Sequence, residues 1–365
     1  MKRKHRIAAA ALAAAHLAGA AGCSNADQSW CAQRGDETLP VGVYVVNLYT
    51  SISTAQNQEG VDSSVSLLEQ QIDGQPAEQW IQNRALLGIK EYFYLKDQLD
   101  ALGAPLTDDE QTEAESLANS MWTIVPDSVK KYVAQDSFTI AYGETSRMLS
   151  KLFDLTYGEG GSQEVSQEDL QEYFEGDYYD FDYLFSSLAY KATTEISGDE
   201  EQQMTDEESA ERKALFEDYA SQIQAGTMTM EDAAEDFGTL ISAAEDQLYH
   251  RTLDSAAVEA SFPEAIKTNL DEMADGEVRC FEVSGLSDGV VVLRKNSIAD
   301  AAEEYLADEA NRNTLLTAMK SDEFTASVEA AADAYSGVTF NDEAIRQYSA
   351  SQFYTFTPSS SSAAG

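Results

Sequence analysis

The sequence predicts an α+β fold in which a mainly helical module is interrupted by a smaller insert that contains strands. Apolar residues recur at helical spacing in long stretches near both ends of the chain, such as 80–102 and 300–328. Between these stretches, residues 178–190 alternate and are rich in aromatics, and 278–283 and 290–295 are short β-branched runs. The longer strands therefore belong to the middle of the chain, and the longest amphipathic helices belong to its two ends.

The first part of the helical module is predicted to open with a small strand-turn-strand. Two short strands flank a turn at residues 34–37, which contains Gly35. Pro40 then suits the first turn of a helix, and the apolar spacing extends that helix over 41–56. The long amphipathic helix 80–102 follows. A later helix, opened by Ser137, closes in the glycine cluster at 157–161, which we take as a domain boundary.

Four helices are predicted to begin at a Ser or Thr that is followed three residues later by an acidic residue. Such a pair satisfies backbone N–H groups that would otherwise lack a partner at the start of a helix. The pairs are Thr107 with Glu110, Ser166 with Asp169, Thr205 with Glu208, and Thr229 with Asp232. We expect the last of these helices to run to about residue 248, and a further short helix to begin at Ser261.

The first twenty-three residues have the layout of a secretory signal. A cationic start is followed by an apolar, Ala-rich run from Ile7 to Ala21 and then by Cys23. This run is shorter than the roughly 20 residues that a membrane-spanning helix needs, so we expect a cleaved signal. Its end is similar to a bacterial lipoprotein box, in which the Cys carries lipid, although Ala20 stands where that box usually has Leu. An ordinary signal peptide with a chance Cys is the alternative.

The charge balance excludes one class of partner. The chain has 65 acidic and 23 basic residues, a net charge of −42. Residues 1–22 carry four basic residues and no acid, so their removal takes the net charge to −46. Such a surface repels phosphate backbones, and we expect no nucleic-acid binding. It also repels anionic lipid, so a lipid on Cys23 would have to hold the protein at the membrane.

The remaining chemistry that the sequence offers is sparse. After residue 22 one histidine is present, His250, which we place in a surface loop after a helix, and the other cysteines are Cys31 and Cys280. A disulfide between these two cysteines is left open. One histidine and two scattered cysteines do not make a zinc site, and we expect no metal and no cofactor. The stretch 285–289 spells Gly-x-Ser-x-Gly but joins two predicted strands, so a hairpin turn is favoured over a nucleophile elbow.

The order of the elements, together with several short motifs, carries a family resemblance. The motifs are Leu152-Phe153 with Tyr157-Gly158-Glu159-Gly160-Gly161, Val165-Ser166-Gln167-Glu168-Asp169-Leu170, Phe262-Pro263-Glu264-Ala265, and Asp275-Gly276-Glu277-Val278. With the lipoprotein-like start, this resembles the PrsA/SurA family of extracytoplasmic foldases, which carry a parvulin-type (PpiC-like) peptidyl-prolyl isomerase domain. The resemblance covers nearly all of the chain after the signal.

The resemblance implies a SurA-like helical chaperone module with an inserted parvulin-like α/β domain. The implied division is a signal peptide at 1–22, a tether at 23–29, an N-terminal helical module at 30–160, a parvulin-like domain at 165–298, helices and a strand that return to the module at 300–343, and a disordered tail at 348–365.

The isomerase chemistry of the family is in question here. The family places one histidine on the first strand of the parvulin domain and another on the last. Tyr183 and Val291 stand at the aligned positions, and residues 238–260, where the family is glycine-rich, contain only Gly238. We therefore assign no catalytic residue and expect isomerase activity to be weak or lost. An active isomerase that uses Tyr183 is the alternative.

The aromatic residues of the first insert strand are candidates for a peptide groove, although core packing is the competing explanation. The four candidates are Tyr178, Phe181, Tyr183 and Phe185. Together these observations favour a lipid-anchored foldase or holdase on the extracytoplasmic face of the cell membrane, whose partners are unfolded or nascent secreted polypeptides. A surface lipoprotein for ligand binding or assembly is a further alternative.

Overall fold

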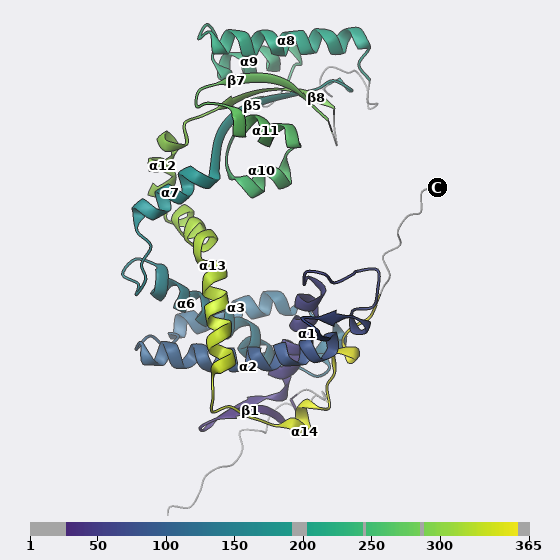
Figure 1. Ribbon diagram of the computed structural model, residues 1–365, viewed down its shortest axis with the longest axis vertical. Helices are drawn as coiled ribbons and strands as arrows, with labels where there is room; N and C mark the ends of the chain where they lie inside the picture. Colours follow the sequence, from purple (N-terminus) through teal and green to yellow (C-terminus); the bar gives the residue numbers. More distant parts are fainter. Residues whose placement is uncertain (1–26, 192–202, 244–245, 285–287, 357–365) are drawn as a thin grey trace, which may run out of the picture. The chain divides into compact units, whose positions relative to one another are not determined.

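The computed structural model describes residues 27–191, 203–243, 246–284 and 288–356. The predicted α+β class is confirmed, and the chain divides into two compact units (Figure 1). Unit 1 comprises residues up to Asp154 together with those from Phe324 onward, and unit 2 comprises Leu155–Glu323. The signal, the proposed lipidation site Cys23 and most of the tether lie outside the described residues. Within them, no helix combines the length and apolarity needed to cross a membrane.

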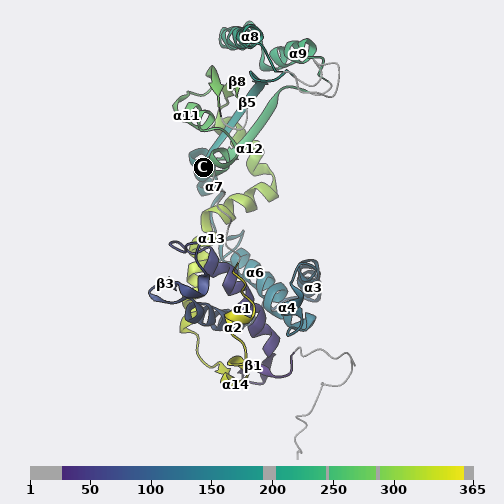
Figure 2. The same cartoon turned by 90° about the vertical axis from the view of Figure 1, so that its right-hand side faces the viewer.

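Unit 1 is a helical bundle with a small three-stranded sheet (Figure 2). Its helices are α1 (Val41–Gln56), α2 (Ala77–Ala101), α3 (Asp108–Trp122), α4 (Asp127–Lys130), α5 (Gln135–Phe138), the π-helical segment η2 (Thr139–Glu144), α14 (Asp342–Ile345) and the short 3₁₀ turns η1 (Leu67–Glu69) and η4 (Ala350–Gln352). Two further helices, α6 (Thr145–Tyr157) and α13 (Glu309–Ala334), cross the unit boundaries, α6 after Asp154 and α13 before Phe324. The strands are β1 (Trp30–Arg34), β2 (Glu37–Pro40), β3 (Gln71–Ile72), β4 (Gln75–Pro76) and β9 (Thr339–Phe340).

The sheet of unit 1 joins the two ends of the described chain. Its order is β2-β1-β9, and Ala32 on β1 pairs with Phe340 on β9. The core beside it is formed largely by α1, whose first half (residues 41–48) is apolar apart from Asn47 and is buried on nearly all sides. Tyr44 and Leu48 of α1 and Phe93 of α2 are almost fully buried. Residues from both ends of the sequence therefore stabilise one fold.

Unit 2 is built on a four-stranded antiparallel sheet of order β6-β5-β8-β7. The strands are β5 (Tyr178–Ser187), β6 (Tyr249–Asp254), β7 (Val278–Val283) and β8 (Gly289–Lys295). The helices are α7 (Gln167–Asp177), α8 (Asp206–Gln224), α9 (Met230–Leu240), α10 (Ser255–Ser261), α11 (Glu264–Glu272) and α12 (Ile298–Ala307).

Helices cover both faces of this sheet, α8 and α9 on one and α10 and α11 on the other (Figure 1). Successive residues of a strand point to opposite faces, so each strand contributes to two cores. Leu184, Val290 and Val292 pack with Phe216 and Phe237 of α8 and α9. The alternate residues of the same strands, among them Phe181, Val291 and Leu293, pack with Val258, Ile266 and Leu270 of α10 and α11.

Three local expectations were wrong. The helix that begins at Thr229 ends at Leu240 and not near residue 248, and the strand β6 follows it. His250 accordingly lies in this strand and not in a loop. At the other end of the chain, the first residues of the expected disordered tail are packed: Phe353 contacts the unit 1 core, and the hydroxyl of Tyr354 accepts a hydrogen bond from the backbone N–H of Leu67 (3.0 Å). Apolar and aromatic side chains hold this segment in place despite its serine content.

Candidate functional site

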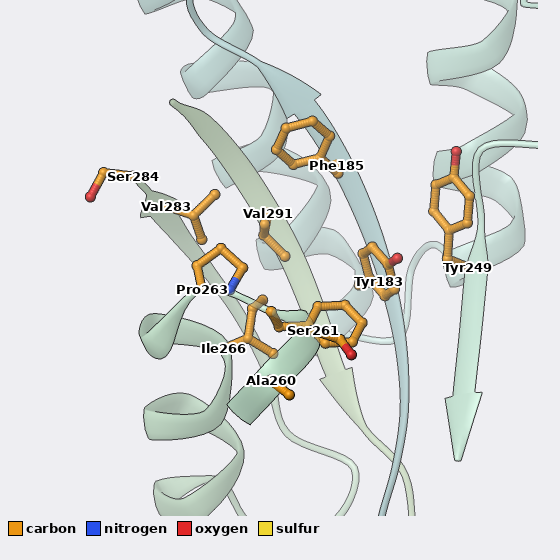
Figure 3. Close-up of a pocket in the computed structure, with 11 residues that line it drawn as sticks. Tyr183, Phe185, Tyr249, Ala260, Ser261, Pro263, Ile266, Val283, Ser284 and Val291 are labelled. Atoms are coloured by element: carbon orange, nitrogen blue, oxygen red, sulfur yellow. The ribbon is translucent and has the colours of Figure 1, made fainter. Parts of the chain in front are cut away.

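The candidate site is a pocket of about 610 Å³ in unit 2, on the face of the sheet that α10 and α11 cover (Figure 3). This volume falls within the range of roughly 300–1,000 Å³ that is typical of ligand sites. Its lining is mostly apolar and aromatic. The lining residues are Tyr183, Phe185, Tyr249, Ala260, Ser261, Phe262, Pro263, Ile266, Val283, Ser284 and Val291.

The strand register places the two sequence-aligned positions in this pocket. Tyr183 and Phe185 are two residues apart on β5 and therefore share a face. Val291 on β8 pairs with Phe185, and it forms part of the pocket wall while being 2% exposed. Tyr183 and Val291, predicted from the resemblance to occupy the positions of two histidines, thus line one cavity.

Three aromatic rings shape one side of the pocket. The rings of Tyr183 and Tyr249 stack with centroids 5.1 Å apart and planes 24° apart, and Phe262 meets Tyr183 edge-on at 5.7 Å. Tyr249 comes from β6, which pairs with β5 at Tyr183. Phe181, fully buried, contacts both Tyr183 and Phe262 from the core. The rings are therefore held by packing before any ligand arrives.

Gly289 is required by the position of Phe185. A Cβ added at residue 289 would lie 2.3 Å from Cε2 of the Phe185 ring and 2.8 Å from the carbonyl oxygen of Ser186. A larger residue at 289 would push the Phe185 ring out of its place beside Val291. The glycine at the start of β8 thus preserves one wall of the pocket.

The polar groups of the pocket are hydroxyls. They belong to Tyr183, Tyr249, Ser261 and Ser284, and the described lining contains no carboxylate, ammonium, guanidinium or imidazole. Burial raises the pKa of the Tyr183 phenol, so this group stays a neutral hydrogen-bond donor at physiological pH. The guanidinium of Arg251 lies over the Tyr249 ring, 5.9 Å from its centroid. The pocket can take an apolar group out of water and offer it neutral hydrogen bonds.

His250 faces the opposite side of the sheet. It pairs with Asp182 in the β5–β6 register, one position from the Tyr183–Tyr249 pair, so its side chain points away from the pocket. There its Nδ1 lies 2.9 Å from Oδ1 of Asp182 and its Nε2 lies 3.4 Å from Oδ2 of Asp180. Asn296 donates hydrogen bonds to both carboxylates. The histidine belongs to a polar cluster at the edge of the sheet and does not reach the pocket.

The aromatic groove candidates separate into three environments. Tyr183 and Phe185 line the pocket, whereas Phe181 lies in the core beneath it. Tyr178 lies elsewhere, with its ring tilted against those of Phe174 of α7 and Tyr305 of α12. Sequence reasoning missed Tyr249 as a lining residue because β6 was not predicted.

Within the described residues, the cysteines and acidic side chains form no further chemical centre. Cys31 and Cys280 are free thiols, and burial raises their pKa values to about 12 and about 11. Neither is therefore a reactive thiolate at neutral pH. Among the residues that the structure describes, no group of three or more His, Cys, Asp or Glu side chains is placed to hold a metal ion.

Comparisons with known proteins found similar solved structures only. No family model and no curated protein matches the chain. The foldase protein PrsA from Lactococcus lactis is 14% identical, with 90% of this chain and 99% of that chain covered and a TM-score of 0.36. PrsA from Streptococcus pneumoniae is 12% identical over 72% of this chain and 87% of that chain (TM-score 0.34), and PrsA from Bacillus subtilis 15% identical over 65% and 83% (TM-score 0.22). TM-scores this low do not establish a common fold.

Proposed function

We propose that this protein is a membrane-anchored, extracytoplasmic folding factor that holds apolar, proline-containing segments of secreted chains and has weak or no prolyl isomerase activity. The observation that carries the proposal is the apolar pocket of unit 2 around Tyr183 and Val291, which we name the Tyr183 pocket. The anchor would be a lipid on Cys23, as the lipoprotein-like start of the sequence implies.

The pocket suits an apolar ring carried by a polypeptide. Burying apolar surface contributes roughly 25 cal/mol per Å², so one proline or aliphatic side chain contributes on the order of 1–3 kcal/mol. A volume of about 610 Å³ accommodates such a side chain together with the neighbouring backbone. The hydroxyls of Tyr183 and Ser261 at the wall are available to hydrogen-bond that backbone. Such a site gives weak, sequence-tolerant binding, which suits a protein that holds many unfolded chains.

The same lining limits catalysis. Rotation about an X-Pro bond faces a barrier close to 20 kcal/mol, and a catalyst must favour the twisted imide over the planar one. A neutral hydroxyl that binds both forms equally does not lower this barrier. The lining, as far as the structure describes it, offers no charged or imidazole group that could respond to the changed imide. We therefore expect the pocket to accelerate X-Pro isomerisation little more than transfer of the bond from water to apolar surroundings would.

A second candidate, an active isomerase, is favoured by one observation. The Tyr183 phenol is held in the pocket by its stacking on Tyr249, and burial keeps it protonated. A fixed donor aimed at the imide nitrogen or carbonyl would contribute on the order of tenfold to a hundredfold to the rate. In this case Tyr183→Phe would remove the activity while leaving the stacked ring in place.

The experiment pairs two assays on the same protein. Suppression of aggregation of an unfolded client is measured beside the cis–trans isomerisation rate of a proline peptide. We expect suppression at stoichiometric protein and an isomerisation rate close to that of the uncatalysed peptide. Efficient turnover that Tyr183→Phe abolishes would replace this proposal with the second candidate. An absence of any effect on aggregation would contradict the folding-factor role itself.

A further inference from the structure

Unit 1 contains a second, smaller pocket whose chemistry differs from that of the Tyr183 pocket. Its volume is about 350 Å³, and it lies between α2, the loop that follows α2, α3, η2 and α6. Every lining residue belongs to unit 1. The lining residues are Tyr92, Lys96, Leu99, Asp100, Pro105, Leu106, Gln111, Ile140, Glu144 and Met148.

This pocket has apolar walls and two carboxylates, those of Asp100 and Glu144. Leu99, Leu106, Ile140 and Met148 supply aliphatic surface, and the carboxylate of Glu144 accepts a hydrogen bond from the Tyr92 hydroxyl (3.2 Å). Glu144 also lines an adjacent pocket of about 370 Å³ that includes further acidic residues. The Glu144 carboxylate is thus placed where an aliphatic chain with a charged end could meet it.

The cations at this pocket are already engaged with other acids. Nζ of Lys96 lies 2.6 Å from Glu37, and Nζ of Lys151 lies 2.6 Å from Glu110 and donates to the carbonyl of Pro105 (2.9 Å). Within the described parts of the chain, no ion pair involves Glu144 or Asp100. Among the described residues, Glu144 and Asp100 therefore line the pocket without a salt-bridge partner.

The environment of Glu144 favours the arrival of a cation. Burial raises the pKa of its carboxyl group, and the neighbouring Glu37 and Glu115 act in the same direction, against the Tyr92 hydrogen bond and Lys96. A positive group bound beside the Glu144 carboxylate would offset the penalty that burial imposes on its ionised form. Glu144 closes η2, and π-helical turns occur preferentially at functional sites.

We propose that this unit 1 pocket binds the side chain of an arginine or lysine carried by an unfolded polypeptide. The aliphatic walls match the stem of such a side chain, and the Glu144 carboxylate matches its charged end. A small volume suits one side chain better than a whole folded partner. The net charge of −46 after residue 22 further favours basic chains over acidic ones.

The test uses the full chain and a fluorescently labelled, proline-free peptide with one arginine between glycines, which offers the apolar Tyr183 pocket no side chain to bind. We expect Glu144→Gln to weaken binding about tenfold or more, as for loss of a charged hydrogen bond. Glu59→Gln is the matched control, because Glu59 is exposed and lines neither pocket of unit 1. The same peptide with citrulline in place of arginine tests the charge on the unchanged protein, and its binding should fall by a similar factor.

Three outcomes would overturn the inference. The first is equal affinity for the arginine and citrulline peptides. The second is an equal loss of affinity for the arginine peptide in Glu144→Gln and Glu59→Gln. The third is binding of spermidine, a polycation without a peptide backbone, as tight as that of the peptide. Ala260→Trp, which obstructs the Tyr183 pocket, should leave the affinity of this peptide unchanged. The proposed binding of a basic side chain in unit 1 is therefore tested independently of the proposed function of the Tyr183 pocket in unit 2.

Discussion

Replacing Gly143 by alanine is expected to destabilise unit 1 by about 3 kcal/mol. A Cβ at this position would lie 2.3 Å from the carbonyl oxygen of Ala114 and 2.9 Å from its carbonyl carbon. Both are backbone atoms of α3, so no side-chain rotation relieves the overlap. Either η2 or α3 must move, and the buried contacts between them are lost.

Urea unfolding followed by tryptophan fluorescence measures this effect in unit 1 alone, because the three tryptophans, Trp30, Trp80 and Trp122, all belong to it. Gly176→Ala is the chemical control. Gly176 is helical, with nothing within 4 Å of an added Cβ, so this change should stabilise unit 2 by roughly 0.5–1 kcal/mol. An unchanged tryptophan transition in Gly143→Ala would mean that α3 and η2 are not packed as described.

Phe181→Ala is expected to destabilise unit 2 by about 3–5 kcal/mol, the usual range for a buried phenylalanine. Phe181 is fully buried, and its ring lies 5.7 Å from that of Phe262 and 6.0 Å from that of Tyr183. The cavity left behind would lie directly under the Tyr183 pocket. Circular dichroism during urea unfolding reports both units, and tryptophan fluorescence reports unit 1 alone. A comparison of the two signals therefore isolates the loss of stability in unit 2.

The conservative change Phe181→Leu keeps most of the apolar volume. We expect it to cost markedly less than the alanine change, with the Tyr183 pocket retained. A loss below about 1 kcal/mol for Phe181→Ala would contradict the placement of this ring in the core. It would also remove the physical reason why Tyr183 and Phe262 hold their positions.

Local chemistry could be predicted from the sequence where it depends on neighbours along the chain. The helix starts at Thr107, Ser166, Thr205 and Thr229 all carry reciprocal side-chain and backbone hydrogen bonds to the acidic residue three positions on. The apolar residues at helical spacing over 41–56 likewise form the largely buried helix α1. In these cases the interacting groups lie within one helical turn or on one helix face.

Features that depend on distant pairing were not predictable. Strand β6 is largely exposed, and its sequence Tyr249-His250-Arg251-Thr252 has no apolar alternation, so only its pairing with β5 makes it a strand. The π-helical turn at η2 has no sequence signal of its own. Its geometry accompanies the close approach of Gly143 to α3.

The residues of the Tyr183 pocket could be predicted from the sequence only in part. The alternation of β5 places Tyr183 and Phe185 on one face, and this could be read from the sequence. Tyr249 and Phe262 reach the same pocket from elements 66 and 79 residues further along the chain, so their contribution required the tertiary structure. Tyr178 is on the same strand but packs against α7 and α12, which strand periodicity does not reveal.

The most direct test of the central claim is the affinity of the full chain for a labelled apolar peptide with a central proline. Ala260→Trp adds a large ring at an exposed position that lines the Tyr183 pocket, whereas Ala256→Trp adds the same ring one turn earlier on α10, outside the lining. We predict that Ala260→Trp weakens binding about tenfold and that Ala256→Trp leaves it unchanged. Equal affinity of the wild-type protein and Ala260→Trp would contradict the assignment of this pocket as the polypeptide site.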